Sequence, residues 1–80
     1  MYKDFAQEKI NLTYKTKNSK LLKILGKLKN DKLYNNEKIR SLVRLSGTEP
    51  LVRILVEGQE ITEVKKKSLE IKKLVRPYLG

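Results

Sequence analysis

The sequence predicts one small α+β domain with the element order β-α-β-β-α. Three segments show the alternating or continuous apolar patterns that are typical of strands. Two further segments place apolar residues three and four positions apart, as amphipathic helices do. Because the chain has only 80 residues, we expect residues 1–80 to form a single domain around one modest core.

The first predicted strand is the segment KINLTYK. Three apolar or aromatic residues alternate there with polar ones, namely Ile10, Leu12 and Tyr14. Successive side chains of a strand point to opposite faces, so this pattern predicts a half-buried strand with Asn11 and Thr13 on the solvent side.

The first predicted helix runs from about residue 19 to about residue 29. Asn18 or Ser19 offers an N-cap side chain. Apolar residues then follow at the spacing of one helix face, namely Leu21, Ile24, Leu25 and Leu28. The segment KNDKLYNNEK comes next and is interpreted as a polar connection.

Two predicted strands follow, IRSLVRL from Ile39 to Leu45 and LVRILVE from Leu51 to Glu57. The connection between them is too short for a helix, so they form an antiparallel hairpin. The second of them is almost continuously apolar, which favours a central position in the sheet. Gly58 is expected to end it.

The last predicted element is a helix from about residue 60 to about residue 78. Its apolar stripe consists of Ile61, Val64, Ile71, Val75 and Tyr78, with Ser68 at one stripe position. Pro77 and Gly80 mark its end. We expect the two helices to cover one face of a small, mainly antiparallel sheet. The tyrosines Tyr14, Tyr34 and Tyr78 are expected in or beside the core.

The composition excludes several kinds of site. The chain contains no cysteine and no histidine, so disulfides, thiolate metal sites and histidine acid–base catalysis are excluded. No apolar run approaches the roughly 20 residues that span a bilayer. The N-terminal segment MYKDFAQEKI carries charges where a signal peptide is apolar. We therefore expect a cytoplasmic protein without a membrane partner.

The net charge of +10 raises the alternative of a small basic nucleic-acid-binding protein. The lysines, however, are spread along the chain, and the run Lys65–Lys67 fits a solvated helix face. An RNA-binding sheet would also need aromatic residues on its open face. Asn11, Thr13, Arg53 and Leu55, which are expected there, do not provide them.

The hairpin connection has the richest polar chemistry in the chain. The segment RLSGTEPLVR places Arg44 and Arg53 at the ends of two paired strands, so the two guanidinium groups can converge. Gly47 permits unusual backbone angles and the close approach of a ligand. Successive N–H groups in such a turn can bind an anion, and the hydroxyls of Ser46 and Thr48 add donors.

An arginine fork matches phosphate oxygens in a bidentate way that lysine does not. Two of the four arginines of the chain are at this turn. The pattern therefore indicates a site for a phosphate monoester. The alternative is an ordinary Ser-Gly-Thr turn with arginines on solvated strand faces. Glu49 is interpreted as a structural partner of an arginine or of loop N–H groups, and Pro50 as a residue that fixes the loop.

The motif RLSGTEPLVRILVEG, from Arg44 to Gly58, resembles the phosphate-binding loop of the C-terminal domain of the α-D-phosphohexomutases. The family pattern is Arg-x-Ser-Gly-Thr-Glu-Pro-x-x-Arg followed by an apolar strand. The rest of the chain matches this domain in element order. The resemblance implies a TATA-binding-protein-like fold and a chain that is the fourth domain of a larger enzyme.

The resemblance also implies a division of labour. In such enzymes a phosphoserine on the first domain exchanges its phosphoryl group with the sugar, with the help of Mg²⁺. The fourth domain holds the phosphate that is not transferred and closes the active site. The phosphate-contacting residues implied for this chain are Arg44, Ser46, Gly47, Thr48 and Arg53, and Glu49 would brace the loop.

The implied partners are a phosphosugar and the remaining domains of the same enzyme. Within the family the resemblance favours the branch that interconverts glucosamine 6-phosphate and glucosamine 1-phosphate for amino-sugar and peptidoglycan precursors. The mannose and glucose phosphate branches are the alternatives. This chain has neither the phosphoserine motif nor the metal loop, so we expect it to bind no Mg²⁺ and to be inactive when isolated.

Overall fold

The computed structural model describes residues 6–79 and contains the five predicted elements in the predicted order. The strands are β1 (Ala6–Thr13), β2 (Ile39–Leu45) and β3 (Leu51–Gly58). The helices are α1 (Ser19–Lys29) and α2 (Ile61–Val75), and a 3₁₀ turn, η1 (Arg76–Tyr78), follows α2. The α+β class and the strand and helix boundaries are therefore confirmed to within a few residues.

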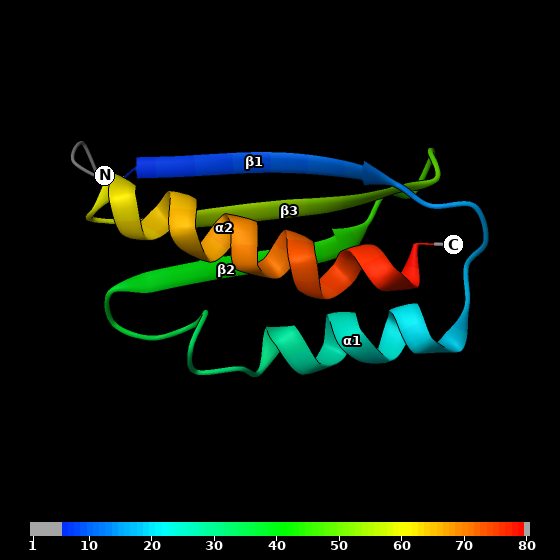
Figure 1. The fold of residues 1–80 in the computed structure, drawn as a ribbon, viewed down its shortest axis with the longest axis horizontal. Helices are drawn as coiled ribbons and strands as arrows, with labels where there is room; N and C mark the ends of the chain where they lie inside the picture. The colour runs from blue at the N-terminus through cyan, green and yellow to red at the C-terminus, as the bar shows by residue number, and fades with distance from the viewer. Residues whose placement is uncertain (1–5, 80) are drawn as a thin grey trace.

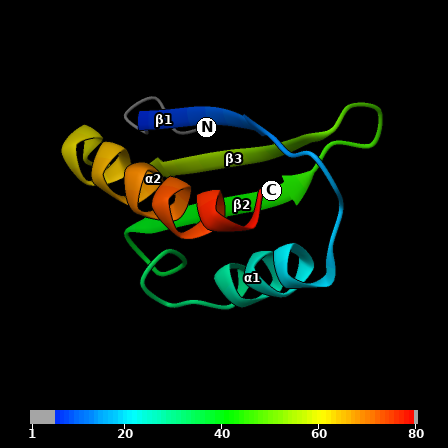
Figure 2. The same cartoon turned by 45° about the vertical axis from the view of Figure 1, so that its right-hand side comes forward.

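The three strands form one antiparallel sheet with the order β1-β3-β2. The almost continuously apolar β3 is the central strand, as predicted. Strands β1 and β2 both run opposite to β3, so α1 connects two strands that flank the central one. Both helices lie on the same face of the sheet, with α2 across β1 and β3 and α1 beside β2 (Figures 1 and 2).

The core lies between this covered face of the sheet and the helices. Strand β3 contributes Val52, Ile54 and Val56, which are at most 2% exposed. From the helices come the buried residues Leu21, Leu25, Leu28, Val64, Ser68, Ile71 and Val75. Burial of these apolar side chains is the main favourable contribution to folding. The alternate residues of β3 therefore point to the other face, which we call the open face.

The cap of α1 and the apolar stripe of α2 agree with the sequence predictions, except at Ile61. Asn18 caps α1, because its Oδ1 accepts a hydrogen bond from Leu21 N at 2.8 Å. In α2 the predicted stripe is buried except at Ile61, which is 47% exposed. Its placement in the core was therefore wrong. Ile61 is the first residue of α2, three positions after β3 ends, so it lies at the edge of the sheet.

The segment between α1 and β2 is more ordered than a polar connection. Asn35 Nδ2 donates to the carbonyls of Leu28 and Lys29 at 3.0 and 3.2 Å, which satisfies free carbonyls at the end of α1. Its Oδ1 accepts from Ser41 N at 3.0 Å. One asparagine thus joins the end of α1 to β2.

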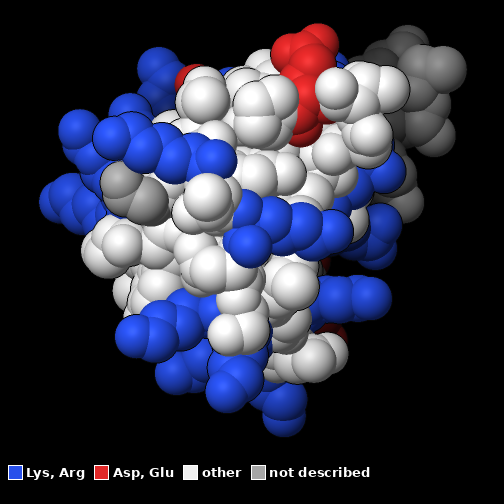
Figure 3. Space-filling model, turned by 90° about the vertical axis from the view of Figure 1, so that its right-hand side faces the viewer, with Lys and Arg blue, Asp and Glu red and all other residues white. Residues whose placement is uncertain are grey.

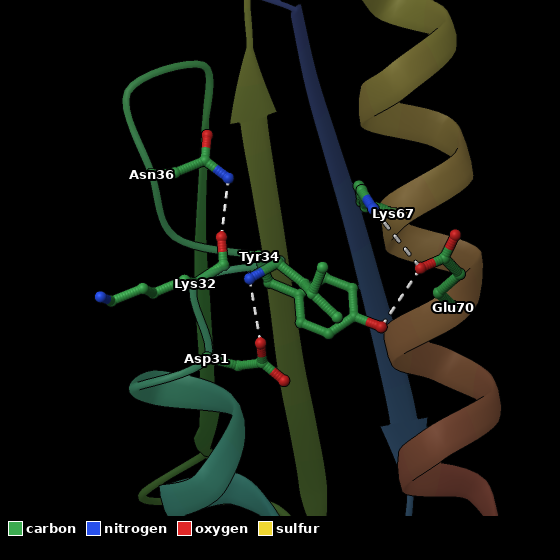
Figure 4. A network of polar contacts seen from close by, with 7 residues as sticks. Asp31, Lys32, Tyr34, Asn36, Lys67 and Glu70 are labelled. Atoms are coloured by element: carbon green, nitrogen blue, oxygen red, sulfur yellow. Dashed lines mark hydrogen bonds and ion pairs between the residues drawn. The ribbon is translucent and has the colours of Figure 1, made fainter.

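Tyr34 anchors the same segment to α2 (Figure 4). Its ring is buried, and its hydroxyl donates to Glu70 Oε1 at 3.2 Å. Lys67 Nζ lies 3.7 Å from the same oxygen and 5.5 Å from the ring centroid. Burial, and then the hydrogen bond to Glu70, raise the pKa of Tyr34. Tyr14 and Tyr78 lie at the core boundary, as expected.

Gly58 is a glycine for steric reasons. It is buried at the end of β3 and pairs with both Ala6 and Ile39. A Cβ at this position would lie 2.8 Å from Lys38 O and 3.2 Å from Val64 Cγ2.

No helix among residues 6–79 is long and apolar enough to cross a membrane.

Candidate functional site

The connection between β2 and β3 is a tight turn anchored from both sides. Ser46 N donates to Leu51 O at 2.8 Å, and Leu51 N donates to Glu49 O at 2.7 Å. Tyr14 N, just beyond β1, donates to Pro50 O at 3.0 Å. The turn is therefore held by its own strands and by the neighbouring strand, which limits its freedom before any ligand binds.

Ser46 organises the inside of the turn. Its Oγ accepts from Thr48 N at 3.4 Å and from Glu49 N at 3.3 Å. Two of the backbone donors that a bound anion would use are thus directed at a side chain. The Ser46 hydroxyl keeps its own hydrogen for donation. These long bonds lie at the weak end of the range, so a charged acceptor would compete with Oγ for the amides.

Gly47 does not use the unusual backbone angles that a glycine permits, because its φ lies outside the positive range that favours glycine. A Cβ on Gly47 would meet no atom within 4 Å. The glycine therefore leaves open space beside the backbone, which agrees with the expectation that a ligand can approach closely.

Arg44 and Arg53 are directly opposite one another in the β2–β3 ladder. Side chains of paired residues share one face of the sheet, and the Cα atoms of such pairs are roughly 4.5–5.5 Å apart. The predicted meeting of the two strand ends is therefore observed, while convergence of the guanidinium groups on the turn stays a prediction. We call these two residues the arginine pair.

The arginine pair has no acidic partner within residues 6–79. The one ion pair among these residues joins Lys67 to Glu70 on α2. Two pairs farther along the same face of the ladder, by contrast, Arg40 lies opposite Glu57. Like charges directly opposite one another destabilise a sheet, whereas opposite charges stabilise it. The arginine pair is thus an electrostatic cost that a bound anion would remove.

The arginine pair lines a shallow hollow of about 230 Å³ on the open face. The other lining residues are Lys9, Asn11, Leu42, Ile54 and Leu55. Sequence reasoning placed Asn11 on this face but assigned no binding role to it or to Lys9. Such a role depends on β1 being the neighbour of β3, which the sequence pattern alone does not give.

The turn residues Ser46, Gly47 and Thr48 do not line this hollow. Ser46 N pairs with Leu51 O, so the turn begins one row beyond the arginine pair. The structure therefore brings the two arginines together and places the turn next to them, rather than around one shared cavity. The carboxylate of Glu49 is at an exposed position, and its bracing role stays a prediction.

The end of the molecule that carries this turn is strongly basic. Lys and Arg side chains make up most of the charged surface in Figure 3, and one prominent acidic patch lies at its upper edge. The connection from β1 to α1 lies at this end and carries exposed lysines at positions 15 and 17.

Within residues 6–79 no three His, Cys, Asp or Glu side chains group as metal ligands.

A comparison with protein families supplies the context for this geometry. Residues 9–74 match the model of the phosphoglucomutase/phosphomannomutase C-terminal domain. The chain belongs to this family. The match includes all of β2, β3 and the turn between them, so the arginine pair and the turn lie inside the matched region.

Individual relatives agree with the family match. The chain is similar to phosphoglucosamine mutases from Acetivibrio thermocellus (46% identity over 51% of the chain), Caldicellulosiruptor saccharolyticus (42% over 56%) and Pseudomonas savastanoi pv. phaseolicola (56% over 45%). These matches cover 9%, 10% and 8% of the respective relatives. The chain therefore spans only a small part of the length of these enzymes.

Proposed function

We propose that this chain is the substrate-phosphate-binding domain of a phosphohexomutase, and that the enzyme is a phosphoglucosamine mutase. The observation that carries the proposal is the arginine pair, two arginine residues that are partners in the sheet and have no acidic partner within residues 6–79. Its position inside the matched family region and the names of the relatives support this function.

The chemistry of the site favours a phosphate monoester as the ligand. Such a group carries a charge of about −1.5 to −2 at pH 7 and three strong acceptor oxygens. Each planar guanidinium can donate two parallel hydrogen bonds to it. We expect Ser46, Gly47 and Thr48 to complete the contacts through the Ser46 and Thr48 hydroxyls and the open backbone at Gly47.

The proposed task of the domain is to hold and orient the substrate. A hollow of about 230 Å³ is below the roughly 300–1,000 Å³ of pockets that enclose a whole small-molecule ligand. We infer that this chain takes one phosphate group, while other domains enclose the sugar and supply the phosphoserine. No bond is made or broken on this chain, and the isolated domain is expected to be catalytically inactive.

Other parts of the proposal concern the complete enzyme. We assign Mg²⁺, which the family resemblance implies, to another domain, since the described residues offer no ligand cluster. Mutases acting on mannose or glucose phosphates are the alternatives for the sugar. We place the enzyme in the cytoplasm, where phosphosugars are made and used.

The proposal is tested by titrating the chain with inorganic phosphate and with glucosamine 6-phosphate, observed by amide NMR. The open site should bind weakly, with a Kd near 1 mM, which corresponds to about −4 kcal/mol. Shifts should centre on the arginine pair and on residues 46–48. Shifts confined to the lysines of α1 and α2 would show non-specific charge binding and overturn the proposal.

In a full-length enzyme that contains this domain, Arg53→Lys should lower kcat/KM at least tenfold. A lysine keeps the charge but loses the fork, and a hydrogen bond to a charged group is worth about 1.5–3 kcal/mol. The control is Arg76→Lys, the same exchange at an exposed position in η1. Equal kinetics for the two variants would remove Arg53 from the site.

A further inference from the structure

We propose that Lys9 and Asn11 of β1 belong to the same phosphate site as the arginine pair, so that all three strands contribute to it. This inference rests on the proposed function and deepens it. It places the bound phosphate over the open face of the sheet, with the turn in contact with it on one side.

The register of the sheet brings these residues together. Asn11 is the β1 partner of Arg53, and Arg44 is its β2 partner. One row of the sheet therefore reads Asn11, Arg53, Arg44, with all three side chains on the open face. The Asn11 amide can donate from its Nδ2 and is at an exposed position.

Lys9 lies diagonally across from Arg53. It is two residues before Asn11 and opposite Leu55 in the next row. Diagonal neighbours of this kind are about 7–8 Å apart, which a lysine side chain spans easily. Lys9, Arg44 and Arg53 thus place three positive charges around one hollow.

The hollow also has apolar lining residues. Leu42 and Leu55 are partners in the row of Lys9. Leu42 is 47% exposed, although it lies in the middle of β2. The two leucines offer no hydrogen-bonding side chain, so the polar contacts of the hollow come from Lys9, Asn11 and the arginine pair. These groups favour a compact, doubly charged oxyanion.

The test compares Lys9→Gln with Lys66→Gln. Both changes remove one positive charge from an exposed lysine, but Lys66 is on α2, which packs on the covered face. Phosphate titrations at fixed low ionic strength should show about a threefold to fivefold weaker Kd for Lys9→Gln, the effect of one partly screened charge. Lys66→Gln should leave the Kd nearly unchanged.

A second readout is the side-chain amide of Asn11, which NMR observes directly. Its signals should shift together with the Arg53 backbone amide as phosphate is added. Equal phosphate affinities for the two lysine variants, together with Asn11 side-chain amide signals that do not shift, would overturn the inference. If Arg53→Lys weakens binding in that case, the proposed function stands. If Arg53→Lys also has no effect, the proposed function fails as well.

Discussion

The two faces of β3 are built from alternate residues of one strand and have opposite properties. On the covered face, Val52, Ile54 and Val56 are buried against the helices. On the open face, Arg53 lies between Asn11 and Arg44 and leaves charge without a counter-charge among the described residues. The first set stabilises the fold, whereas the second set costs stability and prepares the strand for an anion. Changes on the two faces should therefore separate folding from binding.

The largest effect is expected from Ile54→Ala on the covered face. Removing a buried side chain of this size costs about 2–5 kcal/mol. A domain of this length has a total stability of only about 4–12 kcal/mol, so the variant should be close to unfolding. Urea denaturation followed by circular dichroism measures the loss. A variant as stable as the parent would place Ile54 outside the core.

Gly58→Ala should be the next most damaging change. The new Cβ would meet Lys38 O at 2.8 Å, and overpacking of this kind costs about 1–3 kcal/mol. The matched control is Gly26→Ala in α1, where a Cβ meets nothing within 4 Å. That change should stabilise the chain by up to about 1 kcal/mol. If urea denaturation gave stability changes of the same sign for the two variants, the close approach at Gly58 would be contradicted.

Tyr34→Phe tests a polar contact far from the hollow. Losing the hydrogen bond to Glu70 should cost about 1 kcal/mol at neutral pH and leave phosphate affinity unchanged. The pKa of Tyr34 is raised in the folded chain. The neutral phenol therefore contributes stability below pH 10, and this contribution is lost as the pH rises further.

The difference in stability between Tyr34→Phe and the parent chain should therefore shrink above pH 10. Urea midpoints at pH 7 and pH 10.5 measure it, and the other titrating groups are common to both chains. Absorbance at 295 nm should show Tyr34 ionising after an exposed tyrosine would. A constant difference across this range would exclude the buried, neutral phenol.

The smallest effect on stability is expected from Arg44→Gln on the open face. This change removes one of two like charges that face one another, so the chain should become a few tenths of a kcal/mol more stable at low salt. The gain should disappear at 1 M salt, because screening weakens the repulsion. Phosphate affinity should fall at the same time. A loss of stability would mean that Arg44 has a stabilising partner.

The alternation of β3 was enough to predict its two faces, since strand periodicity fixes side-chain directions. That Arg44 and Arg53 lie near one another across the sheet also followed from a short hairpin. Lys9 could not be assigned in this way, because its role depends on which strand lies beside β3. That neighbour is decided by tertiary packing, which a single sequence does not display.

Other differences have equally local causes. Ile61 has the right helical spacing but lies at the edge of the sheet, where there is little to bury it. Asn35 was interpreted as part of a polar connection, although it caps α1 and binds β2. Its partners are six and seven residues away, and no periodic pattern reveals them. A glycine at position 47 permits both unusual backbone angles and the close approach of a ligand, and the structure shows open space there without a positive φ.

The separation of folding from binding is tested most directly by measuring phosphate affinity and urea stability together for Arg53→Lys and Ile71→Val. Arg53 lies on the open face, whereas Ile71 lies on α2 and is fully buried in the core. Arg53→Lys should weaken phosphate binding with a stability change within about 0.5 kcal/mol. Ile71→Val should cost about 0.5–1.5 kcal/mol with an unchanged Kd. Phosphate affinity that is unaffected by Arg53→Lys, or that falls equally in both variants, would contradict a binding face distinct from the core.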